Sequence, residues 1–187
     1  MSLPQPAPRR ELHTRTVVSK GFLRDDGLWD IEGELRDVKS YGYDDRERGV
    51  LAPGMPMHLM RARLTIDDDM VVREVHTDMA EIPFRHCSGA TVGAPALVGA
   101  SLGPGWRRAV DAAMKGVKGC SHMRELMYAM ATTAFQTVSC YREQFVPAVG
   151  APRQADGKAP FFLDQCHSWA ATSPVVARYF PLYFRQG

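Results

Sequence analysis

Alternation of apolar and polar residues predicts strands in the first half of the chain. Over residues 27–39, apolar residues or glycine occupy every second position and charged side chains stand between them. The same period of two, typical of a half-buried strand, runs through residues 57–66 and 71–79. An aspartate triplet at residues 67–69 separates these two segments and predicts an antiparallel hairpin. Residues 12–18, rich in Thr and Val, are a further candidate strand.

Helical spacing replaces the alternation in the second half. Apolar residues recur at intervals of three and four over residues 106–117 and 121–139, which predicts two amphipathic helices. Ser121 is the expected N-cap of the second. Shorter helices are predicted at 94–100 and 174–179. Strands followed by helices indicate an α+β fold, in which an antiparallel sheet of three to four strands carries helices packed on one face.

Three segments are expected along the chain. Residues 1–10, with several Pro and Arg residues, are expected to be a disordered N-terminal segment, and residues 11–145 to form the α+β core domain. Residues 146–187 then provide a linker and a C-terminal tail that packs on the core.

One candidate function is that of a binding module without chemistry. Its interaction surface would be the aromatic residues of the tail: Trp169, Tyr179, Phe180, Tyr183 and Phe184.

Composition limits the classes of partner. The 187 residues are 45% hydrophobic and 24% charged, as in ordinary globular domains. A net charge of +2 is too small to favour nucleic acid or a membrane, so neither is expected as a partner. A protein partner or a homo-oligomer remains open. Because the chain shows neither a signal sequence nor a long apolar segment, we expect a cytoplasmic location, where cysteines stay reduced.

Candidate chemistry is concentrated where cysteine and histidine are neighbours. Three of the four cysteines lie beside a histidine, within residues 86–87, 120–122 and 166–167. Thiolate and imidazole are preferred ligands of zinc and of iron–sulfur clusters. Our first hypothesis is therefore a zinc or iron–sulfur site. Its expected ligands are Cys87, Cys120, His122 and Cys166, with His167 and His58 in reserve.

The same residue types support a second hypothesis, an enzyme or sulfur carrier with Cys120 as its nucleophile. Cys120 precedes a predicted helix, whose free N–H groups and dipole stabilise a thiolate. His122 would act as the base. Glu125, three residues further along the helix, would orient the imidazole.

Structural roles compete with these functional ones. Free cysteines are often buried, so Cys87 and Cys120 are equally well explained as packing residues. Cys140, far from Cys120 along the same predicted helix, is interpreted as a buried or tethering thiol. His58, on an apolar strand face, is better explained as a hydrogen-bonded core residue than as a ligand. The acidic row Asp30, Glu32 and Glu34 fits the solvated face of a strand.

Several motifs resemble a bacterial family known only as a domain of unknown function (number 2889). They comprise Gly27–Asp37 (GLWDIEGELRD), Gly54–His58 (GMPMH), Cys87, Gly105-Trp106, Gly119–Met123 (GCSHM) and Cys166-His167. The usual form of the fifth motif is similar to GCTHL, from which Ser121 and Met123 depart. The resemblance covers residues 12–180 and implies a family without an assigned activity.

A second resemblance concerns the order of elements. The predicted sheet is followed by Cys87 and then by two helices, with Cys120 at the start of the last helix. This order is similar to that of the iron–sulfur cluster scaffold proteins and their sulfur-acceptor relatives. That similarity implies ligands at Cys87, at Cys120 and within residues 40–58, where the chain offers Asp44, Asp45 and His58 in place of a cysteine. Cys166-His167 would then supply the missing ligand.

Overall fold

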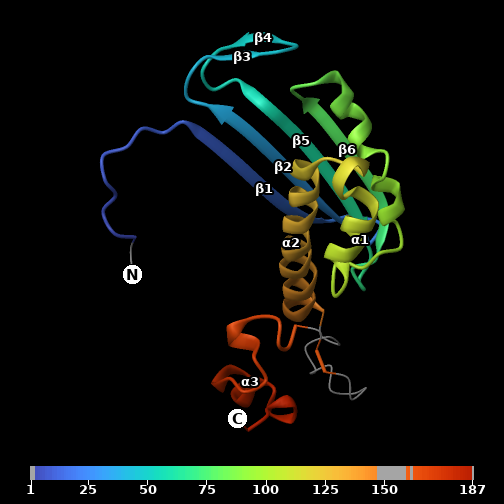
Figure 1. Cartoon of the computed structure of the whole chain (residues 1–187). Coiled ribbons are helices and arrows are strands. Elements are labelled where there is room, and N and C mark those ends of the chain that lie inside the picture. Colours follow the sequence, from blue (N-terminus) through green and yellow to red (C-terminus); the bar gives the residue numbers. More distant parts are fainter. Residues whose placement is uncertain (1–2, 147–158, 161, 187) are drawn as a thin grey trace. The chain divides into compact units, whose positions relative to one another are not determined.

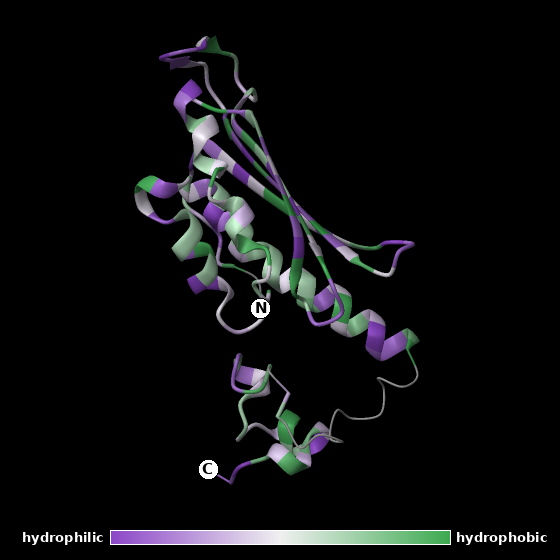
Figure 2. Ribbon diagram, turned by 90° about the vertical axis from the view of Figure 1, so that its right-hand side faces the viewer, coloured by the Kyte–Doolittle hydropathy of each residue, from purple (hydrophilic) through white to green (hydrophobic). Residues whose placement is uncertain are grey.

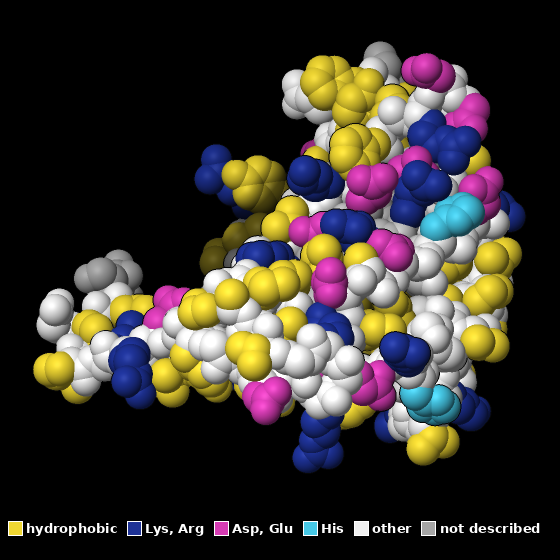
Figure 3. Space-filling model, turned by 90° about the horizontal axis from the view of Figure 1, so that it is seen from above, with side chains coloured by type: hydrophobic (Ala, Val, Ile, Leu, Met, Phe, Trp, Pro, Cys, Tyr) yellow, Lys and Arg dark blue, Asp and Glu magenta, His cyan; other side chains and the backbone are white. Residues whose placement is uncertain are grey.

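The computed structural model describes residues 3–146, 159–160 and 162–186. The chain divides into two compact units, Met1–Thr137 and Val138–Gly187. Among the described helices, none is long and apolar enough to cross a bilayer. Basic and acidic side chains are interspersed over the face shown in Figure 3, consistent with the small net charge.

The first unit contains a four-stranded antiparallel sheet (Figure 1), so the predicted α+β class is confirmed. Its order is β1-β2-β5-β6. The strands are β1 (His13–Leu23), β2 (Trp29–Lys39), β5 (Pro56–Ile66) and β6 (Val72–Glu81). The predicted hairpin of residues 57–66 and 71–79 corresponds to β5 and β6, which pair directly.

Two strand predictions need correction. The first strand was expected to end at residue 18, yet β1 pairs with β2 without interruption as far as Leu23. Residues 40–54, expected to be a loop, contain a small hairpin of β3 (Tyr43–Asp45) and β4 (Gly49–Leu51). Strands of three residues are too short to show a recognisable alternation in the sequence.

Helices cover one face of the sheet (Figure 2). They are α1 (Trp106–Met114) and α2 (Ser121–Phe145), preceded by 3-10 helices at Arg85–Thr91 and Ala94–Leu97 and separated by a third at Gly116–Lys118. Gly33 of β2 permits close packing, because an added Cβ would lie 2.8 Å from Met130 Sδ and 2.9 Å from Leu126 Cδ1. The predicted apolar stripe of α2 in this unit is buried: Met123, Leu126, Met127, Met130 and Ala134.

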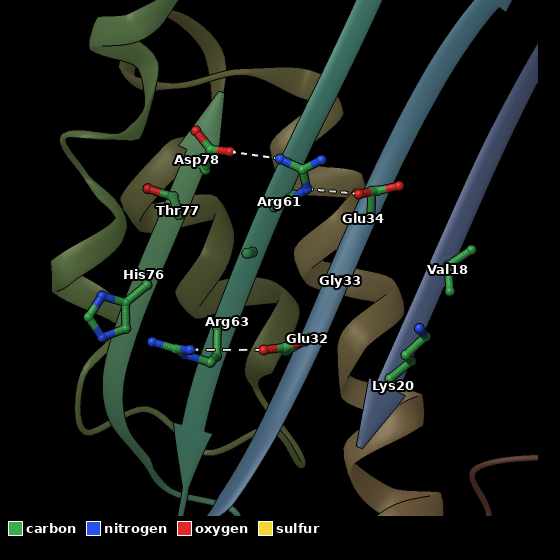
Figure 4. Close-up of a pocket in the computed structure, with 11 residues that line it drawn as sticks. Val18, Lys20, Glu32, Gly33, Glu34, Arg61, Arg63, His76, Thr77 and Asp78 are labelled. Carbon is green, nitrogen blue, oxygen red and sulfur yellow. Dashed lines mark hydrogen bonds and ion pairs between the residues drawn. The ribbon is translucent and has the colours of Figure 1, made fainter. Parts of the chain in front are cut away.

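The opposite face of the sheet is charged and exposed, as predicted for the acidic row of β2. A shallow groove of about 550 Å³ lies on this face and is lined by residues of all four strands. Figure 4 shows these residues. Arg61 binds Glu34 at 2.8 Å and Asp78 at 3.2 Å, so neighbouring charges neutralise each other. Glu32 and Glu34 are 48% and 42% exposed, as predicted for a solvated strand surface, whereas Asp30 is 18% exposed and accepts a hydrogen bond from Thr65.

The second unit comprises the end of α2, α3 (Pro174–Tyr179) and 3-10 helices at His167–Trp169 and Pro181–Tyr183. Phe162, Trp169 and Phe180 form an aromatic cluster with ring centroids 4.8 to 5.5 Å apart. Cys140 is exposed, which corrects its interpretation as a buried thiol. Most of the predicted linker, residues 147–158, lies outside the described residues.

Candidate functional site

Three polar residues lie side by side across the sheet at the end nearest the start of α2. The strand register pairs Arg15 of β1 with Asp37 of β2, and Asp37 with His58 of β5. Asp37 stands two residues after Leu35 on the buried face of β2, and only 1% of it is exposed. A β-bulge at Asp37 and Val38 interrupts the register here, a common feature beside functional sites.

Asp37 is held by a bidentate ion pair. Arg15 donates from Nε to Oδ1 and from Nη2 to Oδ2, both at 2.8 Å. His58 Nδ1 lies 3.1 Å from Oδ2, and His13 Nε2 lies 3.3 Å from Oδ1. Burial alone would raise the pKa of Asp37, but the hydrogen bonds and charge of Arg15 outweigh it and hold that pKa below its usual range.

Cys120, rather than Ser121, occupies the N-cap position of α2. The helix begins at Ser121, and the Cys120 carbonyl accepts a hydrogen bond from the Arg124 amide at 3.0 Å. The half-buried thiol lies 3.6 Å from His122 Nδ1. Burial would raise the pKa of Cys120, but the His122 ring and the amides of Met123 and His122 lower it overall.

His122 joins the thiol to the carboxylate. Its Nε2 lies 3.8 Å from Asp37 Oδ2, while its Nδ1 faces Cys120. Its ring centroid is 4.1 Å from that of His58. The hydrogen bond with Cys120 raises the pKa of His122, whereas burial and the neighbouring His122 lower the pKa of His58. The two imidazoles therefore favour different protonation states.

Glu125 does not take the place expected for it. Its Oε2 accepts a hydrogen bond from Arg15 Nη1 at 2.7 Å, whereas the carboxylate beside His122 Nε2 is that of Asp37. A guanidinium offers a carboxylate a permanent charge and several donors, so Arg15 is a stronger partner than a neighbouring imidazole. Arg15 thereby connects the sheet to α2.

The structure brings together only part of the predicted ligand set. Among the residues that it describes, the group of ligand side chains able to hold a metal consists of Asp37, His58 and His122, with ligand atoms within 4.8 Å of one another. Cys87 lies instead in the 3-10 helix Arg85–Thr91 and is half-buried. The remaining two, Cys166 and His167, are exposed residues of the second unit, and their role stays a prediction.

Asp37 and Arg15 were not among the predicted site residues. A signal for Asp37 is present, because the apolar face of β2 continues from Leu35 to this carboxylate. A carboxylate on a buried face needs a partner and is a reasonable site candidate. For Arg15 the sequence holds no such signal, since its place depends on how β1 pairs with β2.

Gly119, which precedes Cys120, packs closely against Met114 at the end of α1. An added Cβ would lie 2.6 Å from the Met114 carbonyl oxygen and 2.9 Å from its Cα. We therefore expect Gly119→Ala to cost about 1–3 kcal/mol, because a backbone contact cannot relax by changing a rotamer. Denaturant unfolding measures this cost. Gly89→Ala is the control, because a Cβ at Gly89 meets nothing within 4 Å. Equal stability of the two variants would contradict the close contact.

Comparison with known proteins places this site within a family. A family model described as a protein of unknown function (DUF2889) matches residues 13–136. The chain belongs to this family. The DUF2889 region includes the whole cluster from His13 to Glu125. No curated protein and no solved structure matches the chain, so the similarity to iron–sulfur scaffold proteins finds no support.

Proposed function

We propose that this DUF2889 protein is a thiol-dependent enzyme or sulfur carrier in which Cys120 is the nucleophile. His122 is its acid–base partner, and Asp37 positions His122. The observation that carries the proposal is the thiol–imidazole pair, with 3.6 Å between Sγ and Nδ1, at the N-terminus of a 25-residue helix. Nucleophile, base and orienting carboxylate in series are the arrangement that activates a sulfur for covalent catalysis.

Each residue has a defined part in this chemistry. His122 accepts the thiol proton, and the α2 amides stabilise the thiolate that results. The Asp37 carboxylate near Nε2 stabilises the imidazolium, and Arg15 holds that carboxylate in place. Sγ then forms a bond to an electrophilic carbon or sulfur of the substrate. The bond to the leaving group breaks, and His122 returns the proton to that group.

The competing functions rest on weaker geometry. The metal site expected from the cysteines required Cys87 and Cys120 to meet, and the described ligand group contains neither. A binding module would use exposed aromatic residues of the tail; Tyr179 and Phe184 are exposed, but Trp169 and Phe180 pack with Phe162 into one cluster. The thiol–imidazole pair is the arrangement with a direct chemical consequence.

Alkylation by iodoacetamide, followed residue by residue with mass spectrometry, tests the proposal. We expect Cys120 to react faster at neutral pH than Cys140 and Cys166, although both of these are more exposed. Cys120→Ser should remove the fast reaction alone, leaving the other cysteines as internal controls. If Cys120 reacts no faster than free cysteine, it is not an activated nucleophile and the proposal fails.

A further inference from the structure

We propose that Asp37, His58 and His122 form a binding site for one divalent transition-metal ion. This site goes beyond the proposed thiol chemistry and uses none of the cysteines. Its ligands come from three elements, β2, β5 and α2, which meet at one end of the sheet. Two imidazoles and one carboxylate are a ligand set for zinc or ferrous iron that leaves positions open.

The distances between ligand atoms fit such an ion. Asp37 Oδ2 lies 3.1 Å from His58 Nδ1 and 3.8 Å from His122 Nε2. In a tetrahedral zinc site with bonds of about 2.0–2.1 Å, neighbouring ligand atoms stand about 3.3 Å apart. All three ligand atoms lie within 4.8 Å of one another, so the side chains must draw together to bind one ion.

The bidentate contact with Arg15 leaves room for the metal. Each carboxylate oxygen has two lone pairs, and Arg15 uses one on each oxygen of Asp37. The second lone pair of Oδ2 now faces His58 Nδ1, and an ion would replace the proton between them. Arg15 would then hydrogen-bond to the metal ligand Asp37 and fix the orientation of its carboxylate.

Local charge also favours a cation. Glu125 lies beside Arg15 and offsets its positive charge, and Asp37 is almost fully buried. The ion would bind Nε2 of His122 in place of the proton that this nitrogen carries in the imidazolium of the proposed function, so the metal-bound and acid–base states of His122 exclude each other, while Nδ1 of the same ring continues to face Cys120. The thiol therefore lies on the opposite edge of the imidazole and is not a ligand.

Cobalt substitution tests the site without any knowledge of a substrate. The full chain is treated with a chelator and titrated with Co²⁺, and absorption is recorded. We expect one equivalent to bind, with visible bands of low-coordinate cobalt but no near-ultraviolet thiolate-to-cobalt band. Zn²⁺ should displace the cobalt. Absence of binding would overturn the proposal, as would a thiolate band that disappears in Cys120→Ser.

Three variants separate this site from the proposed function. His58→Gln should lower the affinity for Co²⁺ by more than about 100-fold. This loss exceeds the one expected when the substituted residue only hydrogen-bonds to a metal ligand. His76→Gln, on the exposed face of β6, should bind as the wild type does. Cys120→Ser should bind metal but lose the fast alkylation. The far-ultraviolet circular dichroism spectrum of His58→Gln should match that of the wild type, which shows that the variant is folded. Wild-type affinity in His58→Gln would overturn the ligand assignment.

Discussion

Asp37→Ala should lower the free energy of unfolding by about 3 kcal/mol, the lower end of the range for breaking a buried ion pair. Asp37 is 1% exposed and receives two hydrogen bonds from Arg15 and one contact from His58. Without it, Arg15 keeps its charge but loses its partner in the sheet. The Arg15 side chain is 33% exposed, so water compensates part of the loss. Denaturant unfolding followed by circular dichroism measures the difference.

The matched control lies on the other face of β2. Glu34 forms a 2.8 Å ion pair with Arg61, but both side chains are more than 40% exposed. Glu34→Gln should therefore change stability by less than about 1 kcal/mol. If both variants lost the same amount, burial of Asp37 would not be the source of the effect.

Acid should remove the contribution of Asp37 in a predictable direction. Its pKa in the folded, metal-free protein lies below that of an unfolded aspartate, about 3.9. The stabilisation is therefore fully present only above about pH 5, about one unit above the unfolded pKa, and is lost as the pH falls through the folded pKa. The difference in stability between wild type and Asp37→Asn should narrow over the same interval.

Local periodicity explains why the sheet and helices could be predicted. Alternation over β2, β5 and β6 spans ten or eleven residues in each strand, so each strand can be predicted without knowing which strand it pairs with. The β3–β4 hairpin lacked such a signal because its strands have three residues each. The site shows the same contrast: contacts between residues close together in the sequence could be predicted, and contacts between distant elements were missed.

Residue type and local spacing predicted Cys120, His122 and, as a reserve ligand, His58, but not the side chains that the structure places beside them. Cys120 and His122 are two residues apart at one helix start, so their contact follows from the sequence. Asp37 meets His122 only because α2 lies on β2, more than eighty positions away in the chain. Glu125 was assigned to His122 by spacing along the helix, yet Arg15 arrives from β1 and binds it instead. Contacts between distant elements depend on register and packing, which periodicity does not encode.

His122→Gln should slow the alkylation of Cys120 by about tenfold or more below about pH 7, where the wild-type thiol is still partly ionised. The pKa of Cys120 is lowered by the hydrogen bond and charge of His122, together with the amides of α2. Glutamine supplies no positive charge, so the thiol pKa rises and the thiolate fraction falls. Alkylation rates measured across a pH series should show the profile displaced to higher pH.

The control for this variant is His76→Gln, which removes an exposed imidazole from β6 and should leave the profile unchanged. At high pH, where the thiol of every variant is ionised, the rates of wild type and His122→Gln should converge, because the loss lies in the thiolate fraction. A constant ratio at all pH values would instead indicate that His122 affects access to the sulfur. An unchanged profile would assign the activation of Cys120 to the start of α2 alone and remove His122 from the proposed mechanism.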